Sequence, residues 1–145
     1  MTTLAQNPGG ISQKMVGGVV GGLVGGAIFG AMMGMMGMLP MVAGLIGSTS
    51  ALAGFVIHMI ISAVIGVSFG VLFGAQSSTF GRGALWGGIY GAIWWVLGPL
   101  VIMPLMMGMG IQLGAAFSGP MLMSLSGHLV YGVATGLTFA GFIRR

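Results

Sequence analysis

The fold is decided by one stretch of sequence, Gly17-Gly18-Val19-Val20-Gly21-Gly22-Leu23-Val24-Gly25-Gly26-Ala27-Ile28-Phe29-Gly30. Glycine doublets recur at every fourth position, and every residue between them is apolar. Small residues at this spacing form a stripe along one side of a helix and let helix backbones approach closely in a membrane. The stretch therefore predicts a transmembrane helix that packs tightly against its neighbours.

The composition of the whole chain supports this prediction. Its 145 residues include 31 Gly, 15 Met and 4 Lys+Arg, and no Asp, Glu or Cys. Charged residues make up 3% of the chain, against about 25% in a soluble domain. A hydrophobic fraction of 57% excludes intrinsic disorder, and the glycines lack the every-third spacing of collagen. An integral membrane protein remains.

The missing acidic residues exclude several classes of function. Carboxylate general acid/base catalysis, a carboxylate proton relay and an acidic Mg or Ca site all require Asp or Glu. The missing cysteine excludes a disulfide and a thiolate nucleophile. Four scattered cations do not form a nucleic-acid-binding surface. We therefore expect a protein that is not an enzyme, with no catalytic residue and no nucleic-acid partner.

Four apolar segments are long enough to cross a hydrocarbon core, which needs about 20 residues. They cover approximately residues 15–39, 50–74, 83–107 and 120–142. Residues 1–13 form a polar N-terminal segment, and residues 14–145 form one all-α, four-helix transmembrane domain. Lys14, Arg82, Arg144 and Arg145 all fall on one face of this topology. The positive-inside rule then predicts a multi-pass protein of the bacterial inner membrane with both termini in the cytoplasm.

The two halves of the domain resemble each other, approximately residues 14–76 and 81–145. Residues 21–29 match residues 87–95, and a second match is centred on two histidines. His58, Gly66, Ser68 and Phe69 lie 70 residues before His128, Gly136, Thr138 and Phe139. Two-helix repeats insert in the same orientation, so we expect parallel repeats about an axis along the membrane normal.

The small residues form stripes that predict the helix-packing faces. The glycines assigned to this packing are Gly18, Gly22, Gly26 and Gly30 in the first segment, Gly66 and Gly70 in the second, and Gly132 and Gly136 in the fourth.

His58 and His128 are the two histidines of the chain, and each lies on the small-residue stripe of its segment. Ser62 and Ser124 lie one helical turn away and are the supporting polar residues.

Ionisable residues inside a membrane suggest function. Four interpretations stay open: neutral imidazoles that hydrogen-bond the backbone, a pair that senses or relays protons near neutral pH, bis-His ligation of haem b, and a soft-metal site. For the last, His58 and His128 would bind Cu(I) together with methionine thioethers, although methionine also serves as flexible packing.

Four short motifs carry a resemblance to a known family: His58-Met-Ile-Ile-Ser62, Ala84-Leu85-Trp86-Gly87-Gly88, Met103-Pro104-Leu105-Met106-Met107-Gly108 and Ser126-Gly127-His128-Leu129-Val130-Tyr131-Gly132. In this order they resemble the YagU-like family of small bacterial inner-membrane proteins, over approximately residues 58–145. The resemblance implies an association with acid resistance and no established activity.

We therefore expect an accessory or stress-related membrane protein without a cofactor, whose histidine pair senses or relays protons. The alternatives are a membrane subunit that binds haem b or Cu(I), and a scaffold subunit of a larger membrane complex. The expected partners are the lipid bilayer and either further copies of the chain or a larger complex.

Overall fold

The computed structural model describes residues 9–145, and every regular element in that range is helical. In chain order the elements are α1 (Ile11–Met35), α2 (Leu39–Ala43), the 3₁₀ turn η1 (Gly44–Ile46), α3 (Ala51–Phe73), α4 (Phe80–Leu97), the π-helical segment η2 (Gly98–Ile102), α5 (Met103–Met106), the 3₁₀ turn η3 (Leu113–Ala115) and α6 (Gly119–Ile143). The predicted all-α class is confirmed.

Three helical segments are long and apolar enough to cross a membrane: Ile11–Met35, Ala51–Phe73 and Phe80–Met106. The third segment runs from α4 through η2 into α5 without leaving the helical state. Helix α6 has the same 25-residue length as α1, but it contains His128, Tyr131 and several hydroxyl side chains and is not among the three. Of the predicted polar segment, residues 1–8 lie outside the described residues, and 11–13 already belong to α1.

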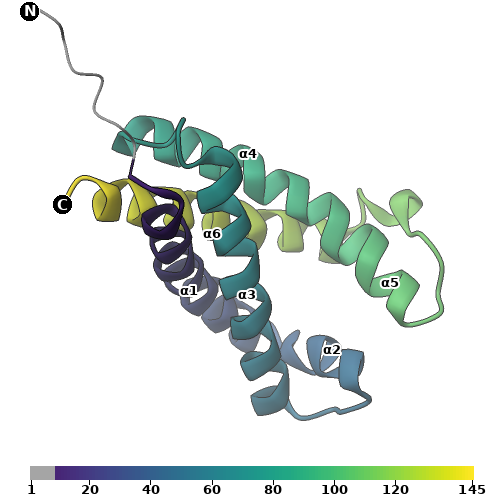
Figure 1. The fold of residues 1–145 in the computed structure, drawn as a ribbon. Coiled ribbons are helices and arrows are strands. Elements are labelled where there is room, and N and C mark those ends of the chain that lie inside the picture. The colour runs from purple at the N-terminus through teal and green to yellow at the C-terminus, as the bar shows by residue number, and fades with distance from the viewer. Residues whose placement is uncertain (1–8) are drawn as a thin grey trace, which may run out of the picture.

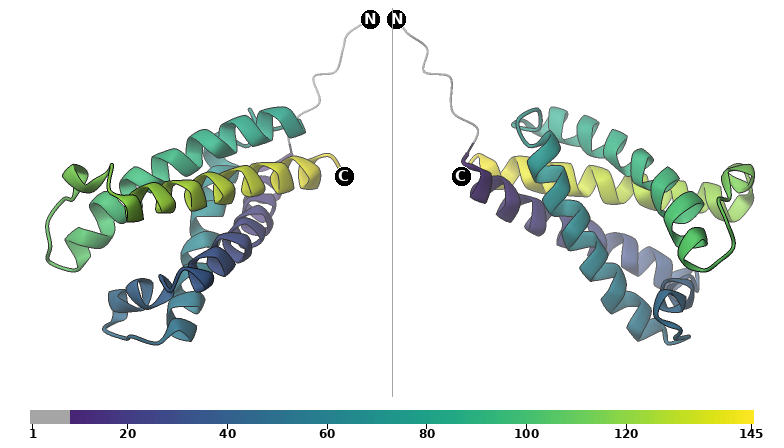
Figure 2. Two further views of the ribbon diagram at one scale, coloured as in Figure 1. Left: turned by 180° about the vertical axis from the view of Figure 1, so that it is seen from behind. Right: turned by 45° about the vertical axis from the view of Figure 1, so that its right-hand side comes forward.

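The helices are arranged in the spatial order α3, α1, α6, α4 (Figure 1). The start of α1, the α3–α4 connection and the end of α6 lie together at one end of the molecule. This end carries Lys14, Arg82, Arg144 and Arg145, and we call it the cationic end. Away from it the α1–α3 pair and the α4–α6 pair diverge into two arms, which end at α2 and α5 (Figure 2).

Backbone contact at glycine joins the helices within each arm. A β-carbon on Gly18 or Gly22 of α1 would overlap a carbonyl oxygen of α3, belonging to Gly66 and Ser62 respectively. In the second arm a β-carbon on Gly83 or Gly87 of α4 would overlap carbonyl oxygens of α6 in the same way. Every one of these hypothetical contacts is shorter than the 3.0 Å that real β-carbons respect. Neither pair of helices could come this close with a larger residue.

The two arms use equivalent glycines. Gly18 meets Gly66 in the first arm, and Gly83 meets Gly136 in the second. Corresponding positions are therefore 65 residues apart in α1 and α4, and 70 residues apart in α3 and α6. The 70-residue offset is the one predicted from the histidines. The match of residues 21–29 with 87–95 has an offset of 66, one residue more than these contacts.

Helix α1 uses a second glycine face to hold the other arm. A β-carbon on Gly21 or Gly25 would press on the α6 backbone, at the carbonyl oxygens of Thr135 and Tyr131. Each glycine doublet of α1 therefore serves two neighbours, with one residue facing α3 and the other facing α6.

The contact between α3 and α4 is different in kind from that between α1 and α6. It is made largely by aromatic side chains near the cationic end: Phe69 and Phe73 of α3, and Trp86 and Tyr90 of α4. A two-fold axis between the arms would pair α3 with α4 as closely as α1 with α6. The packing between the arms lacks this symmetry, in contrast to the expected axis.

Candidate functional site

His58 connects the two helices of the first arm. It lies on α3, is 8% exposed, and its Nε2–H donates a hydrogen bond of 3.0 Å to the carbonyl oxygen of Gly26 on α1. The Ser62 hydroxyl, one turn further along α3, lies 3.5 Å from the same nitrogen. The close approach of α1 and α3 at Gly22 and Gly26 brings the carbonyl within reach of the imidazole. This geometry protonates His58 on Nε2 and leaves Nδ1 as the free nitrogen.

His128 is held within its own helix. It is partly buried on α6, and its Nδ1–H donates a hydrogen bond of 2.8 Å to the carbonyl oxygen of Ser124, one turn earlier. The Ser124 hydroxyl lies 3.4 Å from the same nitrogen. His128 is therefore protonated on Nδ1, and its free nitrogen is Nε2. The two histidines adopt opposite tautomers, each fixed by a backbone carbonyl.

Phe29 of α1 joins the two histidines into one cluster. The centroid of its ring lies 5.3 Å from that of His58 and 4.9 Å from that of His128, and both contacts are edge-type. The ring occupies the space left by Gly127, where a β-carbon would overlap its edge. Phe29 is 5% exposed. We call His58, Phe29 and His128 the His–Phe–His cluster, and it spans the boundary between the arms.

Phe29 was not among the candidates from the sequence, although a signal for it exists. Gly17, Gly21 and Gly25 follow one another at four-residue spacing, and Phe29 is the next position on that face. A face of small residues that ends in a large ring indicates where close backbone contact gives way to side-chain packing.

Two tyrosines also missed by the sequence reasoning donate their hydroxyls to the α3 backbone. Tyr131 of α6 donates to the carbonyl oxygen of Ser62 at 2.9 Å. Tyr90 of α4 donates to the carbonyl oxygen of Ile65 at 3.0 Å and also contacts the Ser68 hydroxyl. Both side chains are buried. They tie α3 to the second arm at points where the helices themselves do not touch closely.

The remaining predicted packing residues lie along the same interfaces. Gly30 faces the Phe55 ring and the His58 imidazole, and Gly70 faces the Lys14 carbonyl at the cationic end. Gly132 and Gly136 face the α4 backbone. The structure therefore brings His58 and Ser62 to the α1–α3 interface, while His128 and Ser124 lie on α6 across the Phe29 ring.

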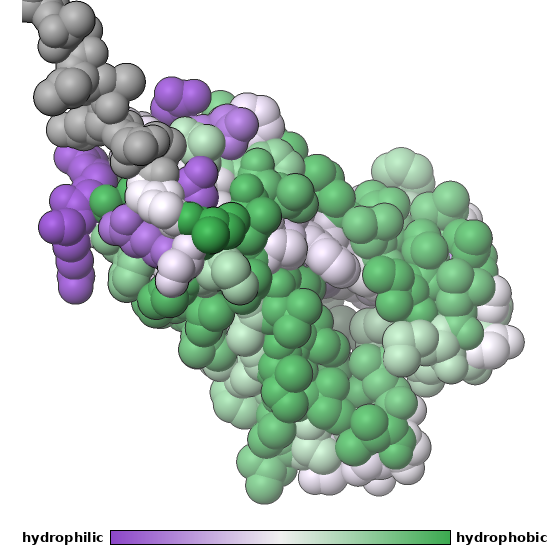
Figure 3. Space-filling view, in the orientation of Figure 1, coloured by the Kyte–Doolittle hydropathy of each residue, from purple (hydrophilic) through white to green (hydrophobic). Residues whose placement is uncertain are grey.

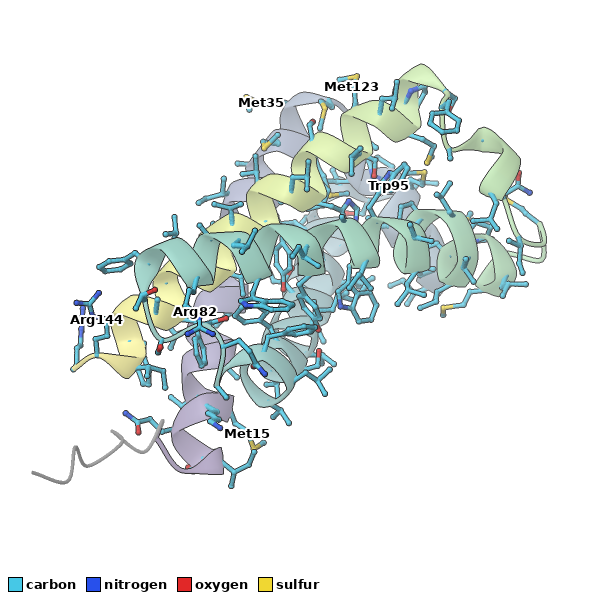
Figure 4. The ribbon with its side chains drawn as sticks, turned by 90° about the horizontal axis from the view of Figure 1, so that it is seen from above. Met15, Met35, Arg82, Trp95, Met123 and Arg144 are labelled. Atoms are coloured by element: carbon cyan, nitrogen blue, oxygen red, sulfur yellow. The ribbon has the colours of Figure 1, made fainter. Side chains whose placement is uncertain are left out.

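Some of the methionines pack near the cluster, on its side away from the cationic end. Met33 is 4% exposed and belongs to one apolar core with Phe29 and Tyr131, against which Met103 of α5 packs. Met35 and Met123 lie at the far end of the molecule from Arg82 and Arg144 (Figure 4). Between residues 9 and 145, no group of three or more His, Cys, Asp or Glu side chains is positioned to hold a metal ion.

The cluster offers two free imidazole nitrogens, Nδ1 of His58 and Nε2 of His128. Two neutral imidazoles, each with one free nitrogen, lie against one apolar ring inside the fold. Ligation of one haem iron by both histidines would require the Nε2 atom of His58 to leave Gly26 and the Phe29 ring to move from its position against both imidazoles. Comparison of the chain with protein-family models, curated proteins and solved structures found no match.

Proposed function

We propose that the chain is a four-span protein of the bacterial inner membrane, built from two parallel repeats, with both termini in the cytoplasm. Helix α6, at 1.5 Å per residue, is about 37 Å long, which exceeds the roughly 30 Å of a hydrocarbon core. It also packs along both α4 and α1. The equivalent glycine contacts of the two arms support a repeat, and the gathering of hydrophilic side chains at one end supports the orientation (Figure 3).

We further propose that this protein is a non-enzymatic, accessory or stress-related membrane protein whose histidine pair responds to protons. The observation that carries this proposal is the contact of one Phe29 ring with both imidazoles at the boundary between the arms. Histidine is the side chain whose ordinary pKa lies between pH 5 and 8. The resemblance to the YagU-like family, with its association with acid resistance, points the same way.

Double protonation would place two positive charges in a confined apolar region. The imidazole centroids are at most about 10 Å apart, since each lies 5.3 or 4.9 Å from that of Phe29. At an effective dielectric constant of about 20 the repulsion at 10 Å is about 1.7 kcal/mol, more than a tenfold change in an equilibrium. The other titratable groups on the helices that pack here are Tyr131 on α6 and Lys14 on α1. Lys14 is distant, about 18 Å along α1 from Gly26. Acidification is therefore expected to separate the arms.

A distance measurement between the two arms tests this response. The chain has no cysteine, so spin labels on Ile46→Cys and Phe117→Cys report on these two positions alone. Both side chains are exposed, 65% and 89%, and both lie away from the cationic end. We expect a longer mean distance at about pH 4 than at about pH 7.5. The same labels in a His58→Gln/His128→Gln background should show no change, and equal distances at both pH values in the original protein would refute the proposal.

Proton conduction is a separate outcome and has its own assay. Proton flux into liposomes is compared between the unaltered protein and His58→Ala. Since Phe29 touches both rings and each imidazole already donates to a carbonyl, we expect sensing without conduction and therefore equal flux. A flux that depends on His58 would assign the pair to proton relay.

The cofactor and scaffold alternatives are tested on the purified protein. A Soret band would identify haem, and copper that is retained after washing and lost in Met33→Leu or Met103→Leu would identify a soft-metal site. The mass of the particle in mild detergent would separate a single chain or homo-oligomer from a subunit of a larger complex. We expect no haem, because Nε2 of His58 is bound to the Gly26 carbonyl, and no retained copper.

A further inference from the structure

A groove of about 370 Å³ opens at the cationic end, where the last turns of α6 lie beside α1 and the start of α4. Val20, Leu137 and Phe142 make its apolar wall, together with the Phe80 ring. Thr138 and Arg145 contribute the polar atoms of its lining. The groove thus combines an apolar interior with a cationic mouth.

The lining of the groove changes from cationic at its mouth to apolar deeper in the membrane. Thr138 lies six residues before Arg144, the C-cap of α6, and Val20 lies six residues after Lys14 on α1. At 1.5 Å per residue, the groove at Thr138 and Val20 is about 9 Å deeper than these cations. A ligand with a charged head and an apolar tail would match this order, with its head at Arg145.

The cations here have no acidic side chain in the protein to pair with. The sequence contains no Asp or Glu, so no side chain of this protein can neutralise Arg145. The neighbouring Arg144 lies over the face of Phe80, with 5.1 Å from its guanidinium carbon to the ring centroid. Arginine binds phosphate oxygens through two parallel N–H donors, which suits a phosphate group at this depth.

A second groove provides a contrast within the same molecule. About 300 Å³ lies between α1 and α3, lined by Leu23, Phe55 and Met59 among other apolar residues. It has no cation and no hydroxyl in its lining, so any lipid chain could fill it. Selectivity for an anionic head is expected only at the groove that Arg145 borders.

We propose that the groove at the cationic end binds one anionic phospholipid, with its phosphate at Arg145 and one acyl chain along α6. Gly141 forms part of the open floor, where a β-carbon would lie 3.5 Å from the Phe80 ring and therefore fit. The proposal rests on membrane insertion with this end at the headgroup level. It does not depend on the histidine pair.

Lipid retention measured by native mass spectrometry tests the site. The protein in micelles is supplied with phosphatidylglycerol or phosphatidylcholine in equal amounts. One phosphatidylglycerol should be retained per chain, in preference to phosphatidylcholine by about fivefold, as expected for one cation near a charged surface. Arg145→Gln should remove the preference, whereas Arg82→Gln, a cation at the same end outside the groove, should keep it. Gly141→Leu should reduce retention of both lipids by filling the floor.

Three outcomes would overturn the site. Equal retention of the two lipids by the unaltered protein would show no selectivity for the head. Equal losses in Arg145→Gln and Arg82→Gln would assign the effect to general surface charge. Displacement of the lipid by inorganic phosphate would identify an anion site without an acyl chain. Because Arg145 is exposed, its replacement tests binding without disturbing the fold. The His58→Gln/His128→Gln protein should retain the lipid, which separates this proposal from the histidine one.

Discussion

Replacement of Gly87 by alanine tests whether backbone contact holds the second arm together. A β-carbon on Gly87 would overlap the Gly132 carbonyl oxygen, lie 2.9 Å from the Gly132 carbonyl carbon and lie 3.2 Å from the Gly136 Cα. These neighbours are backbone atoms and cannot rotate away. Gly88, the next residue on the same helix, is the matched control, since its β-carbon would lie 3.6 Å from a Val133 methyl group in ordinary contact.

The expected difference between the two variants can be worked from these contacts. Ordinary contact of a β-carbon begins near 3.4 Å. The helices α4 and α6 must therefore separate by about 1 Å at Gly87. A gap of that size loses up to half of the attraction in each dispersion contact. Overpacking of this kind costs about 1–3 kcal/mol. The higher helix propensity of alanine adds the same small stabilisation to both variants and cancels in the comparison. Gly87→Ala should therefore be about 1–3 kcal/mol less stable than Gly88→Ala.

Unfolding of the protein in mixed micelles measures this difference. The three tryptophans, Trp86, Trp94 and Trp95, all lie on α4 and report on its packing by fluorescence. Gly22→Ala in the first arm should show a loss of the same order, because its β-carbon would overlap the Ser62 carbonyl oxygen. If Gly87→Ala and Gly88→Ala unfold at the same denaturant concentration, close backbone contact does not hold α4 against α6.

Three further substitutions probe the contacts between the arms. Gly127→Ala should push the Phe29 ring from its place, which NMR of the two imidazoles would detect as shifted ring signals, and unchanged signals would contradict the cluster. Tyr131→Phe removes the hydrogen bond to the Ser62 carbonyl and should lower the free energy of unfolding by about 0.6–1.7 kcal/mol, the range for hydrogen bonds inside membranes. Thr135→Val should leave stability unchanged or raise it by about 1 kcal/mol, because the Thr135 hydroxyl is buried without a hydrogen-bond partner; a loss in the same unfolding assay would reveal a partner.

The sequence predicted the helical class, the first three spans and the faces on which the glycines lie. These features depend on composition and on four-residue spacing, which are local properties of the chain. It did not predict the register between α1 and α4. Glycine doublets align almost equally well when shifted by one residue, and only the contact of Gly22 with Ser62 and of Gly87 with Gly132 distinguishes the two alignments. Phe29 and Tyr131 were missed because spacing within a helix does not say which neighbour a face will meet.

The asymmetry between the arms follows from one face of α4. At an offset of 65 residues, Gly21, Gly25 and Phe29 of α1 correspond to Trp86, Tyr90 and Trp94 of α4. The α1 face lets α6 approach to backbone contact, whereas the aromatic α4 face holds α3 at a distance that side chains must bridge. Equivalent positions of α1 and α4 therefore make different contacts between the arms.

The packing between the arms changes in character at the histidines. Between the arms, close contact of α1 with the α6 backbone occurs at Gly21 and Gly25 and then changes to the Phe29 ring. Beyond Phe29 the arms meet through flexible thioethers, with Met103 against the first arm and the Met107 methyl near Gly44. Methionine tolerates irregular gaps and adapts its shape. The His–Phe–His cluster thus lies at the transition from rigid to adaptable packing. The proposed electrostatic repulsion would therefore move the outer arms, while the glycine contacts near the cationic end would stay closed.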